Sequence, residues 1–159
     1  MAYDPGDMLV LANYLLRTPV PAGQDESRWR AAIGRCYYAC LLRARDQLWG
    51  IDGWPTGGQK GRLPKGPKGR DLGTHEQIIE ALGVNRAGPS PAKGIRLRNS
   101  LLSLKALRTA ADYRHSDSHP DVQKLFNQYS VSTWSELAEQ ALILSSQTLP
   151  ELSTVKKFA

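Results

Sequence analysis

The 159-residue sequence predicts an all-α protein. Apolar residues recur at three- and four-residue steps in several segments, and no alternating pattern typical of strands persists for more than a few residues. Eleven of the fourteen glycines lie between Gly50 and Gly94, together with several prolines. We therefore expect one domain over residues 1–159, with helices on both sides of a Gly/Pro-rich loop at 50–72.

The segment before the loop predicts two helices. Asp4 is a good N-cap and is followed by Pro5, which favours a helix that ends near Arg17. Its expected buried stripe is Met8, Leu11, Ala12 and Leu15. The segment 25–49 predicts a longer helix whose apolar stripe is Trp29, Ile33, Cys36, Tyr37, Cys40, Ala44 and Leu48.

Capping signals place the helices that follow the loop. A capping box at Thr74 and Gln77 predicts a short helix through Leu82, which Gly83 ends. Ser90 and Pro91 predict the start of a helix that runs to about 114, buried along Leu97, Leu101, Leu104 and Ala111.

The C-terminal region predicts one more long helix and a tail. A second capping box, at Thr133 and Glu136, starts a helix that packs through Leu137, Ala141 and Leu144. Residues 121–129 are expected to add a short helical piece, and 150–159 a C-terminal tail.

Composition excludes several classes of protein. No apolar run approaches the ~20 residues of a membrane span, and the acidic N-terminus does not resemble a secretory leader, so we expect a cytoplasmic protein without membrane attachment. Cys36 and Cys40 lie four residues apart on a predicted helix without a second pair of metal ligands. We interpret them as small buried residues and expect neither a metal nor a cofactor.

Positive charge is concentrated in one segment of the chain. The net charge is +6, and residues 57–70 hold five basic side chains and no acid. These are Lys60, Arg62, Lys65, Lys68 and Arg70. Such a segment attracts polyanions, although a flexible and merely solvated loop has the same composition.

The helix predicted to end near 114 carries a candidate catalytic pair. Seven residues are almost two helical turns, so Arg108 and His115 are expected about 20° apart on one face. Asp112, four residues after Arg108, can hold the guanidinium in an ion pair. Lys105, Tyr113 and Arg114 add polar groups nearby.

Two interpretations of this constellation stay open. A histidine can move a proton from a ribose hydroxyl while an arginine stabilises charge on the phosphate, which is the chemistry of metal-independent RNA cleavage. The same residues also suit a structural role at the end of a helix. His75, beside the basic loop, either contacts an anion or has a structural role, and it is a weaker functional candidate than His115. His119 is a weaker functional candidate still.

Three segments, in order, resemble the HEPN family of small helical domains. The first is Arg35-Cys36-Tyr37-Tyr38-Ala39-Cys40, similar to the tyrosine pair on that family's long second helix. The second is Thr74-His75-Glu76-Gln77, which is like the segment that opens a short helix in that family. The third is Arg108-Thr109-Ala110-Ala111-Asp112-Tyr113, which looks like the Arg-x-x-Ala-Asp-Tyr element of one branch.

The resemblance implies an up-and-down bundle of four to five helices that pairs as a homodimer. It also implies a metal-independent RNA endonuclease of a toxin or antiviral defence system. Arg108 would then bind phosphate, and Asp112 would orient the Arg108 side chain. His115 would act as acid or base, and Tyr37 and Tyr113 would line the cleft. RNA contacts would come from the basic loop with Lys105 and Arg114, and His75 would lie near the cleft. The resemblance allows a second interpretation, a non-catalytic module that binds RNA, nucleotide or a partner such as a cognate antitoxin or a nucleotidyltransferase.

Overall fold

The structure, a computed structural model, describes residues 4–85 and 90–158. Every regular element in these two ranges is a helix, which confirms the all-α prediction for the described part of the chain. Residues 1–3, 86–89 and 159 of the predicted domain, the last of them in the predicted tail, lie outside the described residues. No helix of the described ranges combines the length and the apolar character that a membrane span requires.

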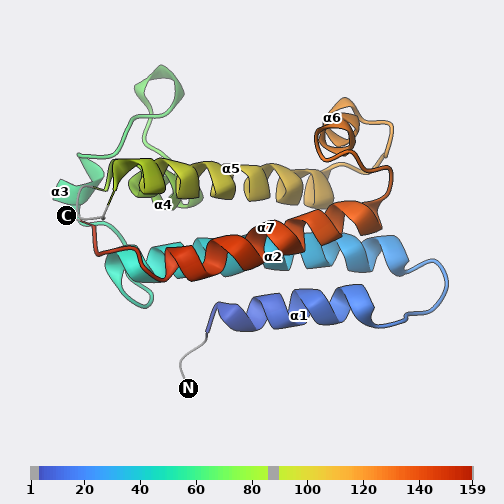
Figure 1. Ribbon diagram of the computed structural model, residues 1–159. Helices are drawn as coiled ribbons and strands as arrows, with labels where there is room; N and C mark the ends of the chain where they lie inside the picture. Colours follow the sequence, from blue (N-terminus) through green and yellow to red (C-terminus); the bar gives the residue numbers. More distant parts are fainter. Residues whose placement is uncertain (1–3, 86–89, 159) are drawn as a thin grey trace. The chain divides into compact units, whose positions relative to one another are not determined.

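The helices follow the predicted order closely (Figure 1). Their bounds are α1 Gly6–Arg17, α2 Asp25–Trp49, α3 Gly57–Lys60, η1 Pro67–Gly69, α4 Thr74–Val84, α5 Pro91–Tyr113, α6 Pro120–Gln128 and α7 Trp134–Leu152. The predicted basic loop therefore contains the short helix α3 and the 3₁₀ turn η1, which sequence periodicity did not indicate. Elements of three or four residues are too short to show a helical period.

The chain divides into two compact units, and the boundaries fall within α2, α5 and α7. Unit 1 consists of Met1–Ala39 and Ser103–Gln147, and unit 2 of Cys40–Leu102 and Thr148–Ala159. Unit 1 contains α1, α6, the first part of α2 and most of α7. Unit 2 contains the basic segment and α4.

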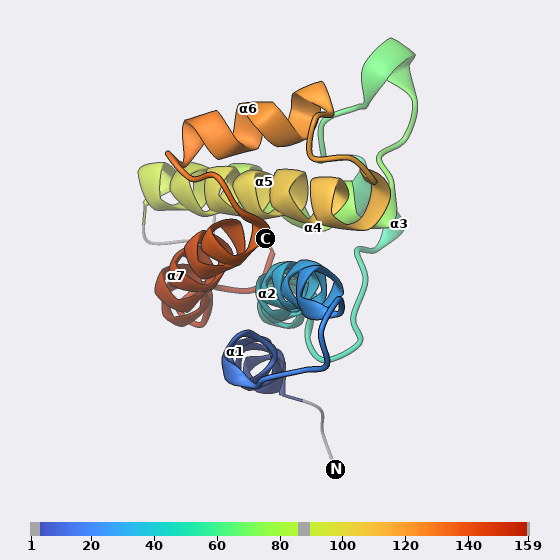
Figure 2. The same cartoon turned by 90° about the vertical axis from the view of Figure 1, so that its right-hand side faces the viewer.

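In unit 1, α1 lies antiparallel beside the first part of α2 (Figures 1 and 2). The expected stripe of α1 is partly wrong, because Leu11 is 41% exposed whereas Leu16 is buried with Ala12. One residue along a helix turns the side chain by about 100°, so a face centred on Ala12 and Leu16 leaves Leu11 toward solvent. The α2 stripe is confirmed at Ile33, Cys36 and Tyr37 and, in unit 2, at Cys40, Ala44 and Leu48, whereas Trp29 is only half-buried.

The capping boxes have different outcomes. Before α7 the N-cap role of Thr133 is confirmed, since the Glu136 amide donates to the Thr133 hydroxyl at 3.2 Å. At α4 the N-cap is Gly73 rather than Thr74, and the Gly73 amide donates to the Glu76 carboxylate at 3.3 Å. Glycine has no side chain that could cap the helix, but its own backbone amide is satisfied by the carboxylate of Glu76, three residues later.

In unit 2, α4 and the first part of α5 approach each other closely. A Cβ atom added to Gly94 would lie 2.5 Å from the carbonyl oxygen of Leu82, so only glycine permits this approach. The Arg98 guanidinium donates to both carboxylate oxygens of Glu80, at 2.9 and 2.7 Å. Gly83, expected to end α4, lies inside it, because α4 continues to Val84.

The C-terminal segment of unit 2 is packed rather than free. Helix α7 continues to Leu152, into the segment predicted as a tail. After it, the Phe158 amide donates to the Leu48 carbonyl at 2.9 Å, and its ring lies 6.0 Å from that of Trp49. Phe158 is buried, so the last described residues contribute to the core of unit 2.

Candidate functional site

A polar cluster of unit 1 is centred on Arg108. We call it the Arg108 cluster; it consists of Arg108, Asp112 and Tyr113 on α5 with Tyr37 and Tyr38 on α2. The Arg108 Nε atom lies 2.7 Å from Asp112 Oδ2, the ion pair expected from the four-residue spacing. Its guanidinium carbon lies 5.9, 5.4 and 5.3 Å from the ring centres of Tyr37, Tyr38 and Tyr113, within the range of cation–π attraction.

The Arg108 side chain is mostly buried, with 16% of it exposed. Its Nε–H makes no hydrogen bond, so the contact with Asp112 is an ion pair without hydrogen-bond geometry. One terminal nitrogen donates to the Tyr113 hydroxyl at 3.4 Å. Burial opposes the charge, but the oxygens of Tyr38, Asp112 and Tyr113 outweigh it and raise the pKa of Arg108. The cluster therefore holds a permanent cation.

Tyr37 packs in the interior and does not line an open cleft. It is fully buried, because it belongs to the apolar stripe of α2. Burial raises the pKa of its phenol well above the usual range, and the nearby Arg108 charge offsets only part of this effect. Tyr113, by contrast, is 56% exposed at the last position of α5.

His115 lies outside the helix that was expected to carry it. Helix α5 ends at Tyr113, so the 20° relation between positions 108 and 115, which requires a continuous helix, does not extend to this histidine. The His115 side chain is exposed. Its neighbour Arg114 pairs with Asp121 at 3.0 Å, so this predicted RNA contact is engaged in a structural ion pair.

Arg30 anchors the end of α5, a role that the sequence did not reveal. Its guanidinium donates to the carbonyl oxygens of Ala111, at 3.2 Å, and of Arg114. It also stacks over Trp134, with 4.1 Å from the guanidinium carbon to the ring centre. The Trp134 indole N–H in turn donates to Asp117 at 2.6 Å. A cation at these carbonyls is favourable because they form the negative end of the helix.

The basic segment 57–70 belongs to unit 2, and its five cations are all exposed. Lys65 pairs with Asp71 at 2.6 Å, which lowers the pKa of that carboxyl, and Arg70 lies 3.5 Å from Glu76. The guanidinium carbon of Arg62 lies 5.2 Å from the Phe158 ring centre. Among the described residues, no acid forms an ion pair with Lys60, Arg62 or Lys68.

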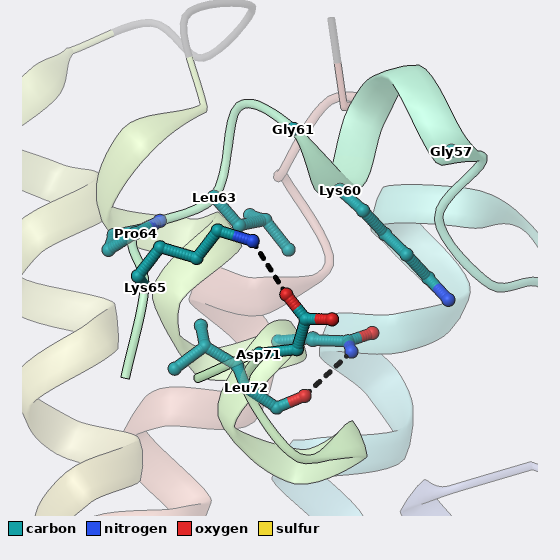
Figure 3. A pocket seen from close by; sticks show the side chains of 9 residues that line it. Gly57, Lys60, Gly61, Leu63, Pro64, Lys65, Asp71 and Leu72 are labelled. Carbon is teal, nitrogen blue, oxygen red and sulfur yellow. Dashed lines mark hydrogen bonds and ion pairs between the residues drawn. The ribbon is translucent and has the colours of Figure 1, made fainter. Parts of the chain in front are cut away.

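The same segment, together with Asp71, Leu72 and Gln77, lines a pocket of about 260 Å³ (Figure 3). Its lining residues are Gly57, Lys60, Gly61, Leu63, Pro64, Lys65, Asp71, Leu72 and Gln77. The Lys65–Asp71 ion pair crosses it, while the Lys60 side chain extends away from that pair. The side-chain amide of Gln77 donates to the Leu72 carbonyl at 2.9 Å. Because Lys65 pairs with Asp71 and Gln77 with the Leu72 carbonyl, few polar groups inside the pocket are left to bind a ligand.

The other predicted site residues occupy less distinctive positions. Lys105 is half-buried on α5 in unit 1, and His75 is half-buried in the first turn of α4 in unit 2. The His119 ring accepts a hydrogen bond from the Asp121 amide at 3.1 Å and so caps α6. Burial raises the pKa of the Cys36 thiol to about 11, which makes it a weak nucleophile at neutral pH.

Metal ligands do not cluster in the described ranges: no group of three or more His, Cys, Asp or Glu side chains is placed to share an ion. Comparisons of the chain with protein-family models, with curated proteins and with solved structures find no match.

Proposed function

We propose that this protein is a HEPN-type helical domain that binds RNA without cleaving it. The observation that carries the proposal is the basic segment 57–70, whose cations are exposed and of which, within the described ranges, only Lys65 and Arg70 pair with acids. A polyanion gains most from side chains that form no ion pair with an acid, and among the described residues these are Lys60, Arg62 and Lys68. RNA supplies a regular row of phosphates for them.

The Arg108 cluster supports a non-catalytic function. The guanidinium is mostly buried and interacts with Asp112 and three tyrosine rings, as expected for a side chain that joins α2 to α5. A group suited to proton transfer near neutral pH, such as a histidine, beside a fixed arginine is the minimum for RNA cleavage without a metal. No titratable histidine belongs to this cluster among the described residues, because the one that follows α5 lies beyond the helix.

The binding proposal is tested by fluorescence anisotropy with a labelled RNA. The variant Lys60→Ala/Lys68→Ala removes two exposed cations of the basic segment, and the control Lys124→Ala/Lys157→Ala removes two exposed cations elsewhere. The net charge of the two variants is identical. The proposal expects weaker binding only for the first variant. Equal affinity of both variants would show that net charge, rather than this segment, attracts the RNA.

A second function, metal-independent RNA cleavage, is favoured by the surroundings of His115. This exposed histidine lies two residues after the end of α5, and Arg30 anchors the carbonyl of the preceding residue, Arg114. In this alternative Arg108 binds phosphate and Asp112 orients the Arg108 side chain, while His115 transfers the proton of the ribose hydroxyl. Cleavage of cellular RNA in EDTA by the wild type, lost in His115→Ala, would establish this function and overturn the first.

The proposed assembly is a cytoplasmic homodimer with a cognate protein partner, an antitoxin or a nucleotidyltransferase. It is supported by the resemblance of the sequence to HEPN domains, and two buried cysteines that are not joined in a disulfide suit a reducing compartment. Light scattering after size exclusion tests the dimer, which a monomeric mass at micromolar concentration would contradict.

A further inference from the structure

A half-exposed tryptophan lies three residues before the basic segment 57–70. Trp54 is 48% exposed, and it follows the end of α2 by five residues and precedes α3 by three. A single exposed aromatic residue is common on protein surfaces and does not by itself indicate a site. The surroundings of Trp54 are what distinguish it.

The backbone on both sides of Trp54 is fixed. The Gly53 amide donates to the Gly50 carbonyl at 2.9 Å, and a Cβ atom at Gly53 would lie 2.0 Å from the Trp49 carbonyl oxygen, so this tight turn requires glycine. On the other side Pro55 is buried. The next residue, Thr56, caps α3: its amide donates to the Gln59 side chain at 2.8 Å, and its hydroxyl accepts from the Gln59 amide at 3.3 Å.

The indole ring itself is supported from one side by Arg45. The guanidinium carbon of Arg45 lies 5.7 Å from the Trp54 ring centre. Arg45 is held in turn by Asp46 at 2.9 Å and Asp52 at 3.2 Å, and only 15% of its side chain is exposed. The ring is thus both supported and accessible. An aromatic surface fixed before binding loses little conformational entropy when a ligand stacks on it.

We propose that Trp54 is a stacking platform for an unpaired RNA base, so that the RNA partner is single-stranded. This inference rests on the proposed RNA binding. Any base can stack on an indole, whereas the bases of a duplex are already stacked on one another. Lys60 follows Trp54 by six residues, so their Cα atoms are at most about 20 Å apart. Phosphates that flank the stacked base therefore come within reach of the basic segment.

The test compares a labelled RNA strand of about 12 nucleotides with the duplex of the same sequence. The proteins are the wild type, Trp54→Ala and Trp54→Phe, with Tyr14→Ala as control, because Tyr14 is an exposed aromatic residue of unit 1. We expect the wild type to prefer the single strand and Trp54→Ala to lose about 5- to 150-fold in affinity for it. Trp54→Phe and Tyr14→Ala should bind the single strand nearly as the wild type does.

A second measurement does not depend on the folding of the alanine variant. Single-stranded RNA should quench tryptophan fluorescence in the wild type and much less in Trp54→Phe. Wild-type protein that binds the duplex as tightly, or Trp54→Ala that binds the strand as tightly, would overturn the stacking proposal and leave RNA binding intact. Wild-type protein that binds neither RNA would overturn both proposals.

Discussion

Replacement of Arg108 by alanine should destabilise the fold, because the cluster uses this side chain to join α2 to α5. The variant loses the ion pair with Asp112, the contacts with three tyrosine rings and the packing of a side chain that is only 16% exposed. It keeps the helix, since alanine is the best helix former.

The expected loss follows from these contacts. An ion pair at a four-residue spacing whose acid is 36% exposed contributes only about 0.3–0.5 kcal/mol. The cation–π contacts contribute about 0.5–1 kcal/mol each at exposed sites, and one cation shared by three rings gives less than their sum. The buried stem adds about 1 kcal/mol. We expect a total of about 2 kcal/mol, within a range of about 1–3 kcal/mol.

Urea denaturation followed by circular dichroism measures this loss. With a slope of about 2 kcal/mol per molar urea, the midpoint should fall by about 1 M. Arg35→Ala is the matched control, because Arg35 is exposed on α2 and should change stability by less than about 0.5 kcal/mol. A midpoint for Arg108→Ala equal to that of the control would refute the structural role and leave Arg108 free for chemistry.

Three further predictions concern the helix end, the helix contact and the buried thiol. Arg30→Ala should cost about 1–3 kcal/mol in a urea melt, and Arg30→Lys should recover little of it, because a lysine cannot reproduce the guanidinium fork that donates to two carbonyls. Gly94→Ala should lower the melting temperature despite the better helix propensity of alanine, since its Cβ would lie 2.5 Å from the Leu82 oxygen, and an unchanged melt would show that α5 shifts freely. For Cys36 the pKa is raised to about 11, so from pH 9 to 11 the unfolded chain releases a proton that the folded chain keeps. Stability should therefore fall as the pH rises, by up to about 1.4 kcal/mol per pH unit, and Cys36→Ala should show a smaller fall in the same titration.

Local signals in the sequence were sufficient for most of the fold. The α2 bounds, the start of α5 and the cap of α7 follow from apolar spacing and from Ser, Thr and Pro at helix starts, which act within a few residues. The face of α1 could not be predicted, because Met8, Leu11, Ala12, Leu15 and Leu16 allow two neighbouring stripes and only tertiary packing selects one.

The candidate site was only partly predictable for a similar reason. The ion pair of Arg108 with Asp112 lies within one helical turn, so spacing alone indicates it. Arg30 donates to a carbonyl 81 residues away, and no local pattern encodes such a contact. The end of α5 at Tyr113 decides whether His115 shares a face with Arg108, and helix ends are the least certain part of any pattern.

The dependence of RNA affinity on salt, measured in EDTA with the RNA recovered and sized afterwards, decides whether the basic segment 57–70 binds RNA without cleaving it. Non-catalytic binding through this segment predicts that affinity falls steeply between about 50 and 200 mM salt and that the RNA stays intact. It also predicts that Lys60→Ala/Lys68→Ala flattens the slope by about 0.7 for each lysine that contacts a phosphate. An affinity insensitive to salt, or a slope unchanged in this variant, would contradict the account, and RNA shortened by the wild type but not by His115→Ala would replace it with cleavage.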